Sequence, residues 1–196
     1  MGTDCYSSAE RRLLLSLARD AIAAGISGRR PTMPEDLPSA LLEQRSCFVS
    51  LHVRAGGHLR GCIGSLAAHE PLALNVAGNA HNAAFEDPRF PAVSSLEELA
   101  GLEIEISVLT PARPIASPAE FEVGRHGIIL RVAGRSAVFL PQVAPEQGWD
   151  RETTLVHLGL KAGLAPNAWQ RPDARFLVFE AIVFSESSEP PIHDHR

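Results

Sequence analysis

The first regular pattern of hydrophobic positions along the chain is that of an amphipathic helix. Apolar residues recur at three- and four-residue spacing over residues 14–22, which places them on one helical face. Ser7 and Glu10 precede this run with the spacing of a capping box, and Gly25 follows it as a plausible stop. We therefore predict that the chain opens with a helix that ends at Gly25.

Two later stretches alternate between apolar and polar residues, as the strands of a half-exposed sheet do. Residues 47–54 are followed by a glycine-rich turn and a second arm over residues 59–66, which predicts a β-hairpin. Gly61 and Gly64 interrupt the second arm, so we expect a bulge or a close backbone approach there. Residues 127–140 predict a second hairpin.

The remaining patterns predict two more helices and two more strands. Helical spacing returns over residues 72–85, and again between Asp150, a good N-cap residue, and Gly163, a good stop. Residues 102–108 are apolar on one face and acidic on the other, as in a strand with one face buried. A single apolar strand is predicted over residues 175–184.

The order of these elements predicts an α+β fold. Paired hairpins with helices between them, in place of strict alternation of strand and helix, favour a largely antiparallel, curved sheet with flanking helices. Closure of that sheet toward a barrel stays open. The 196 residues are enough for a sizeable core, in one domain or in two tightly packed subdomains.

Composition and charge narrow the class of protein. The chain is 45% hydrophobic and 21% charged, which is ordinary for a globular protein. Its net charge of −5 argues against nucleic acid and anionic membranes as partners. Three cysteines without a C-x-x-C spacing indicate a reducing compartment. No apolar run approaches the roughly 18 residues of a membrane span, so we expect a cytosolic protein.

The segment Leu59–Gly64 carries the most unusual chemistry in the chain. Arg60 would favour the thiolate form of Cys62, and backbone N–H groups beside Gly61 and Gly64 could hold an anion or an oxyanion. The alternative is that Cys62 is a small core residue and that the glycines only permit a bulge.

Ionisable side chains gather again at the end of the second predicted helix. His81 is a candidate general base, and the adjacent carboxylates of Glu86 and Asp87 could bind a cation or orient a water molecule. Carboxylates at a helix C-terminus oppose the helix dipole, so Arg89 is the expected compensating charge. A purely structural network of ion pairs and caps is the alternative.

Three further residues are candidates because of their places in strands and loops. Glu103 and Glu105 share one face of a predicted strand, roughly 6.5 to 7 Å apart along it, although alternation on a half-exposed sheet also predicts such a pair. Gln142 lies in a loop between a strand and a helix, where binding sites are often built. The chain contains none of the common phosphate-binding, dinucleotide or zinc-protease motifs, and we predict neither a metal nor a cofactor.

Taken together, several segments closely resemble the AMMECR domain family, named for the Alport syndrome, midface hypoplasia and elliptocytosis chromosomal region. In this context the hexapeptide LRGCIG is highly specific, and the resemblance covers roughly residues 8–185. It rests on six segments that appear in the family's order, namely residues 59–64 (LRGCIG), 82–90, 102–109, 140–144, 148–150 and 161–164.

The resemblance implies more about the fold than about the function. It implies a two-subdomain α+β fold with a barrel-like sheet, a single AMMECR-type domain over residues 8–185, and flexible termini at residues 1–7 and 186–196. The bacterial members that the chain most resembles, called AmmeMemoRadiSam system protein A, recur with a Memo-like protein and a radical SAM protein, which are therefore the expected partners. No reaction and no cofactor are implied. Members often carry a cysteine where this chain has Gly159, so a mechanism that needs a second thiol there is in doubt.

Two functions from different classes remain. The first is an accessory or substrate-handling component whose LRGCIG surface docks a Memo-like or radical SAM protein, with Arg60 and Arg89 among its anchors. The second is an enzyme that acts on a small anionic or carbonyl substrate, with Cys62 as nucleophile or redox thiol, His81 or Glu86 as base and Arg60 as the anion ligand. Its cleft would be completed by Asp87, Glu105 and Gln142. Because the sequence has no complete set of catalytic residues, it favours the first.

Overall fold

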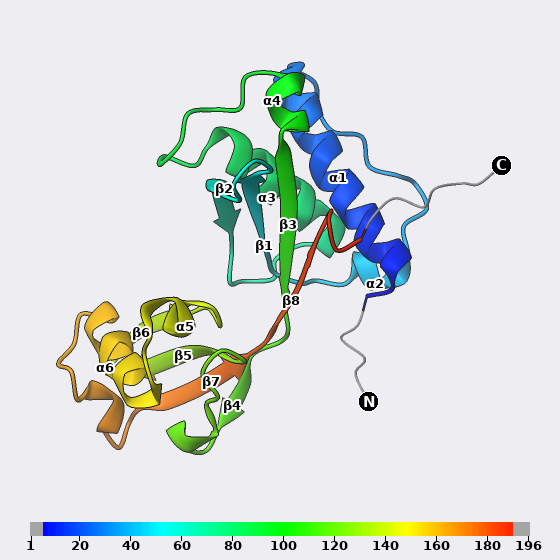
Figure 1. The fold of residues 1–196 in the computed structure, drawn as a ribbon. Helices are drawn as coiled ribbons and strands as arrows, with labels where there is room; N and C mark the ends of the chain where they lie inside the picture. The colour runs from blue at the N-terminus through cyan, green and yellow to red at the C-terminus, as the bar shows by residue number, and fades with distance from the viewer. Residues whose placement is uncertain (1–5, 190–196) are drawn as a thin grey trace. The chain divides into compact units, whose positions relative to one another are not determined.

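The structure, a computed structural model, describes residues 6–189 of the chain (Figure 1). The chain divides into two compact units. Of the described residues, unit 1 comprises 6–109 and 182–189, and unit 2 comprises Thr110–Ala181. Each unit has its own hydrophobic core and, within the described residues, its own four-stranded sheet.

Unit 1 opens with helix α1, Ser8–Ile26, and the predicted capping box at its N-terminus is confirmed. The backbone N–H of Glu10 donates to the Ser7 hydroxyl, and the Ser7 N–H donates to the Glu10 carboxylate. The apolar face of α1 packs against helix α3, Leu72–Phe85. These local signals could be read from the sequence because they involve neighbours in the chain.

The predicted stop of α1 at Gly25 is wrong, because Gly25 lies inside the last turn. A side chain at this position would meet the Phe85 ring, and its Cβ would lie 2.9 Å from the His81 Nδ1 atom of α3. Glycine is therefore needed here for close helix packing. The left-handed residue beyond the helix is Gly28, with φ of 64°.

The sheet of unit 1 has the strand order β2-β1-β3-β8. The predicted first hairpin is confirmed, and β1 pairs antiparallel with both β2 and β3. Two short helices, α2 and α4, complete the unit. The bounds are β1 Cys47–Val53, β2 Leu59–Gly64, β3 Leu102–Leu109, β8 Ala181–Ser185, α2 Ser39–Leu42 and α4 Leu96–Ala100.

Alternation along the strands separates a core face from an open face. Val49 and Leu51 of β1 and Ile104 and Ile106 of β3 are fully buried in the core that α1 and α3 cover (Figure 1). The residues between them point to the other face and are only half-buried. We call this second side the open face of unit 1.

Unit 2 is built on a sheet with the strand order β4-β7-β5-β6, in which each recorded pairing is antiparallel. The predicted hairpin is β5 and β6, and the predicted cap is confirmed, since the Asp150 carboxylate accepts the Thr153 N–H at the start of α6. The bounds are β4 Arg113–Ile115, β5 Gly127–Val132, β6 Arg135–Phe139, β7 Arg175–Phe179, α5 Val143–Gln147 and α6 Arg151–Lys161, with 3-10 turns at Pro118–Glu120 and Ala168–Gln170.

The prediction of one strand over residues 175–184 is wrong. β7 ends at Phe179 and pairs in unit 2, whereas β8 begins at Ala181 and lies beside β3 in unit 1. Between them, the Glu180 N–H donates to the Thr110 hydroxyl and the Glu180 carbonyl accepts the Thr110 N–H, both at 2.9 Å. An apolar run does not reveal which strand each half will pair with, so the division is invisible in the sequence.

The α+β class with antiparallel pairing is confirmed, and within residues 6–189 the strands form two four-stranded sheets. None of the helices in this part of the chain is long and apolar enough to cross a membrane.

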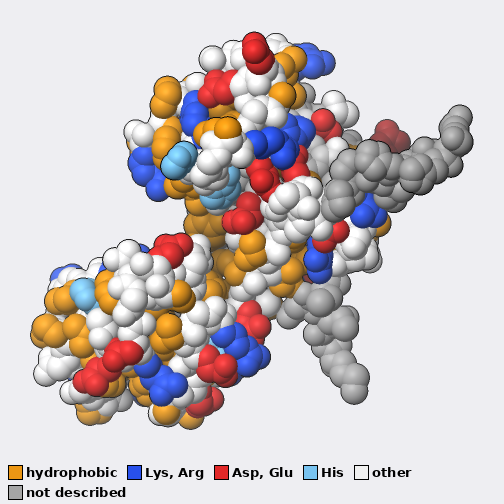
Figure 2. All heavy atoms as spheres, viewed as in Figure 1, with side chains coloured by type: hydrophobic (Ala, Val, Ile, Leu, Met, Phe, Trp, Pro, Cys, Tyr) orange, Lys and Arg blue, Asp and Glu red, His pale blue; other side chains and the backbone are white. Residues whose placement is uncertain are grey.

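Ion pairs fasten the segment after β8 to the rest of unit 1. Glu186 binds the Arg19 guanidinium through two contacts of 2.6 Å and Arg54 through one of 2.7 Å, while Glu189 binds Arg11 at 3.0 Å. On the face that Figure 2 shows, acidic and basic side chains lie next to one another in the same way. The outer parts of the termini expected to be flexible, residues 1–5 and 190–196, lie outside the described residues.

Candidate functional site

The hexapeptide Leu59–Gly64 forms β2, an edge strand of the unit 1 sheet. Its pairing with β1 skips one residue between Gly61 and Leu59, which leaves Arg60 as the extra residue. The bulge that the sequence predicts is thus confirmed and lies at Arg60. A bulge increases the local twist and turns the neighbouring side chains away from the regular alternation.

Both glycines of the hexapeptide are required by packing. A Cβ on Gly61 would collide with the backbone carbonyl oxygen of Ala83 in the last turn of α3. A Cβ on Gly64 would collide with the Phe48 ring and lie 2.5 Å from the Cys47 carbonyl oxygen. Helix α3 therefore lies directly on the backbone of β2, and this close approach needs no ligand to explain it.

A side-chain pair completes the backbone hydrogen bonds of Cys62 at the sheet edge. The Cys62 N–H donates to Asp87 Oδ2 at 2.9 Å, and the Cys62 carbonyl accepts from Arg89 Nη2 at 3.2 Å. Asp87 and Arg89 follow the end of α3, so the loop after the helix closes over β2. The pair takes the place of a neighbouring strand and protects the edge.

The Asp87 carboxylate is held in its charged form. Its side chain is 2% exposed and accepts from Arg89 Nε at 2.9 Å, Arg89 Nη2 at 2.7 Å and the Arg89 N–H at 3.1 Å. The hydrogen bonds from the Arg89 side chain, aided by the Cys62 N–H, hold the pKa of Asp87 well below its usual range even though burial opposes this. The compensating role expected of Arg89 is therefore directed at Asp87.

The Cys62 thiol lies in a row of polar side chains on the open face of unit 1. Ser50 of β1 lies directly opposite Cys62 and donates its hydroxyl to the sulfur at 3.3 Å. Glu105 of β3 lies directly opposite Ser50 on the other side. Residues that oppose each other in antiparallel strands share a face, so thiol, hydroxyl and carboxylate form a line across three strands. All three residues are half-buried.

Arg60 is committed to α4. Its Nη2 and Nε atoms donate to one Glu98 oxygen at 2.7 and 3.1 Å, and only 14% of its side chain is exposed. The other Glu98 oxygen accepts from the N–H and hydroxyl of Ser94. Arg60 therefore fastens the bulge of β2 to α4.

His81 and Glu86 occupy other parts of unit 1. The His81 ring packs against Phe85, with 4.7 Å between ring centroids, and against Gly25 of α1. That contact is with the helix α1, whereas the Cys62 side chain lies on the sheet face that the helices do not cover. Glu86 is the exposed C-cap of α3. Gln142 belongs to unit 2, where it precedes α5.

The structure also uses residues that the sequence interpretation missed. Cys47 is buried, its N–H and thiol both donate to the Asn75 amide oxygen at 3.1 Å, and its carbonyl accepts from Asn79. Burial raises the pKa of the Cys47 thiol to about 12. The signal was available, because Asn75 and Asn79 are polar residues one turn apart on an otherwise apolar helical face. Ser50 carried no comparable signal.

Chemically, the open face offers a half-exposed thiol on a rigid strand. The Cys62 thiol accepts from the Ser50 hydroxyl, which is not a base near neutral pH, and the Arg89 guanidinium also lies close enough to interact with the Cys62 side chain. No group of three or more His, Cys, Asp and Glu side chains in this part of the chain is arranged to hold a metal ion.

Known proteins match this chain over nearly its whole length, both in sequence and in structure. The family model AMMECR1 matches residues 15–184. Protein MK0488 of Methanopyrus kandleri is 40% identical over 94% of this chain and 93% of its own length, and a protein of Thermococcus gammatolerans is 43% identical over 88% of both. The crystal structure of the uncharacterized protein PH0010 from Pyrococcus horikoshii matches with a TM-score of 0.75 and 38% identity, covering 90% of this chain and 91% of that one.

Proposed function

Because this chain belongs to the AMMECR1 family, we propose that it is an accessory or substrate-handling component that works in the cytoplasm with a Memo-like protein and a radical SAM protein. Its recognition surface is the open face of unit 1 around Cys62. This surface extends over the β2 edge to Arg89 and Phe90.

One observation carries the proposal: the chain holds the backbone of Cys62 in place and leaves its thiol half-exposed, with no hydrogen bond to a base among the described residues. Asp87 and Arg89 fix both backbone groups of Cys62, while Gly61 lets α3 lock the strand from behind. The hydroxyl of Ser50 is the partner of the sulfur. Rigid, pre-organised surfaces lose little entropy on binding. Arg89 is a cation close to Cys62, but a guanidinium cannot accept the thiol proton and its charge is balanced by Asp87.

The charges on this surface indicate the chemistry of the partner. Glu105 lies in the row with Cys62, and the described residues include no ion pair to its carboxylate. At the strand edge, the Arg89 side chain is 56% exposed, and its guanidinium lies 5.5 Å from the centroid of the Phe90 ring. Arginine and aromatic residues are frequent interface anchors. The partner therefore presents a basic or amide-rich patch to Glu105 and an acidic group near Arg89.

The test is binding of the purified full-length protein to the Memo-like and radical SAM proteins of the same organism, each measured separately by biolayer interferometry. Glu105→Arg reverses the charge on the open face. Glu35→Arg is the matched control, because Glu35 is exposed in the connector after α1. Far-UV circular dichroism of both variants checks that they are folded.

We expect Glu105→Arg to weaken binding of at least one partner by about tenfold or more, and Glu35→Arg to leave it within about twofold. Equal binding by wild type and Glu105→Arg would show that the open face is not the recognition surface. Failure of both partners to bind the wild-type protein would overturn the proposed function itself.

A further inference from the structure

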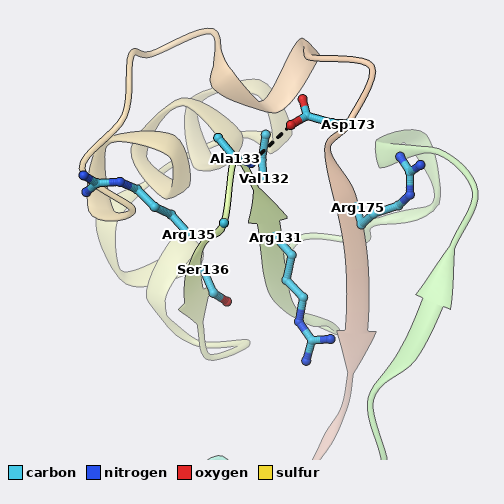
Figure 3. A pocket seen from close by; sticks show the side chains of 8 residues that line it. Arg131, Val132, Ala133, Arg135, Ser136, Asp173 and Arg175 are labelled. Carbon is cyan, nitrogen blue, oxygen red and sulfur yellow. Dashed lines mark hydrogen bonds between the residues drawn. The ribbon is translucent and has the colours of Figure 1, made fainter.

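An open, shallow cavity of about 460 Å³ lies at the surface of unit 2, at the end of the sheet next to the β5–β6 turn (Figure 3). Its lining includes three arginines, Arg131, Arg135 and Arg175, together with Ser136 and Asp173. The volume falls within the range of small-molecule sites. None of these residues takes part in the recognition surface of unit 1.

The strand register places two of the arginines side by side. Arg131 of β5 lies directly opposite Arg175 of β7 and, on its other side, directly opposite Ser136 of β6. The three residues therefore form a row on one face of the sheet, away from the buried face of Leu130 and Val132. All three are exposed. Like charges directly opposite each other destabilise a sheet, so this arrangement calls for a counter-ion.

The described part of the chain supplies no counter-ion for the row. Within residues 6–189, the side chains of Arg131 and Ser136 have no hydrogen-bond or ion-pair partner. Arg175 donates to the backbone carbonyls of Pro172 and Ala174, which carry no net charge to balance its own.

The one carboxylate in the cavity lining, that of Asp173, is already hydrogen-bonded to other groups of the protein. Asp173 accepts from Arg171 Nε at 2.8 Å and from the Ala133 N–H at 3.2 Å, the contact drawn as a dashed line in Figure 3. Arg135 donates to the Ala162 carbonyl at 3.3 Å. The cavity lining therefore carries three guanidinium charges, while its one carboxylate is paired with a fourth arginine outside it.

The turn beside the row is held open. Ala133 and Gly134 both have positive φ, of 50° and 71°, and the Asp173 carboxylate fastens the first of them. A Cβ on Gly134 would meet nothing within 4 Å, so the space over the turn is free. Figure 3 shows the guanidinium groups of Arg131 and Arg175 extending in different directions from neighbouring strands. A ligand that reaches both must offer several acceptor oxygens.

We propose that this cavity binds a small phosphorylated molecule, with Arg131 and Arg175 as its main phosphate ligands and Ser136 as an additional donor. A phosphate group carries about two negative charges and three acceptor oxygens, and the planar guanidinium binds it through paired hydrogen bonds. Arg131 is free to turn toward the ligand because it has no internal contact to break. The net charge of −5 favours a small ligand over nucleic acid.

The experiment is isothermal titration of the full-length protein with sodium pyrophosphate and with inorganic phosphate at constant ionic strength. Arg131→Gln removes the unpaired charge without breaking an internal contact. Arg113→Gln is the matched control, because Arg113 is an exposed arginine on β4 of the same sheet and does not line the cavity. Amide chemical shifts of residues 133–136 in two-dimensional NMR report where the anion binds.

We expect sub-millimolar binding of pyrophosphate by wild type, weakening of about tenfold or more in Arg131→Gln, and a change within about twofold in Arg113→Gln. Equal weakening in both variants would show only general charge attraction and would overturn the proposal. So would the absence of heat and of shifts at about 10 mM pyrophosphate. Vesicles that contain phosphatidylserine, and a single-stranded RNA, are tested in parallel. If either of them binds in an Arg131-dependent way and pyrophosphate does not bind, the proposal of a small phosphorylated ligand is overturned.

Discussion

Asp87→Asn tests whether the loop after α3 holds the LRGCIG strand in place. The substitution keeps the shape of the side chain but replaces one carboxylate oxygen by an amide nitrogen. Oδ1 can still accept the Arg89 N–H and Nε–H. The position of Oδ2, which accepts from the Cys62 N–H and from Arg89 Nη2, then holds a donor that faces two donors. An amide flip moves the conflict to the other pair without removing it.

The structure sets the magnitude of this effect. A hydrogen bond to a charged group contributes about 1.5 to 3 kcal/mol, and two of them are lost in a nearly buried position. Because the Arg89 side chain is 56% exposed, water screens part of its share, and we expect a net loss of about 3 kcal/mol in the free energy of unfolding. Urea denaturation at pH 7 followed by far-UV circular dichroism measures it. Asp36→Asn is the control, since Asp36 is exposed in the connector after α1 and its substitution should hardly move the midpoint.

The pH dependence follows from the lowered pKa of Asp87. A carboxyl group whose pKa is lower in the folded state than in the unfolded state stabilises the fold fully above its unfolded pKa, about 3.9, and loses that effect as the pH falls toward the folded pKa. The stability difference between wild type and Asp87→Asn should stay constant from pH 7 to 5 and narrow below about pH 4. A difference under about 1 kcal/mol at pH 7, or one that widens in acid, would refute this account of the loop.

Two further pairs of measurements test the packing of β2 and the state of the thiols. Gly61→Ala drives a Cβ into the backbone carbonyl of Ala83 and should lower the free energy of unfolding in urea by at least about 2 kcal/mol. The control is Gly78→Ala inside α3, where a Cβ would meet nothing within 4 Å and the substitution should stabilise the protein by about 0.5 to 1 kcal/mol. Equal urea midpoints for the two variants would contradict the close approach of α3 to β2. In iodoacetamide labelling read by peptide mass spectrometry, Cys62 should react in the folded protein and Cys47, whose pKa burial raises to about 12, only after unfolding. Protection of Cys62 equal to that of Cys47 would contradict the exposed thiol.

The sequence predicted the elements whose determinants are local. The capping box of α1, the Asp150 cap and the two hairpins depend on residues within a few positions of one another, and the structure confirms them. The end of α1 was predicted incorrectly because the role of Gly25 is set by Phe85 on another helix. The prediction of a single strand in place of β7 and β8 is wrong for the same reason, since the strands that pair with each half are distant in the chain.

In the candidate site, too, the sequence could not predict which side chains are buried, because burial depends on contacts that are distant in the chain. Glu86 and Asp87 are adjacent carboxylates, and either could orient a water molecule or bind a cation as far as the sequence goes. In the structure, Asp87 turns inward to the Cys62 N–H and Arg89, while Glu86 is left at the surface. Which of two neighbours is buried depends on the path of the loop after α3, and that path is fixed by contacts with β2.

The residues of the hexapeptide can then be separated into those that the fold requires and those that are available for function. Glu98 holds two nitrogens of the Arg60 guanidinium, but the buried Nη1 atom of Arg60 has no hydrogen-bond partner among the described residues. Gly61 and Gly64 are required by the approach of α3 and Phe48, so the two glycines are accounted for without a ligand. Cys62 is not, because its backbone is held through the N–H and C=O groups that any non-proline residue has, and its side chain lies on the open face. A residue whose side chain the fold does not require is the one most free to serve recognition. The Cys62 side chain and its neighbour Glu105 are therefore where substitutions should separate binding from stability.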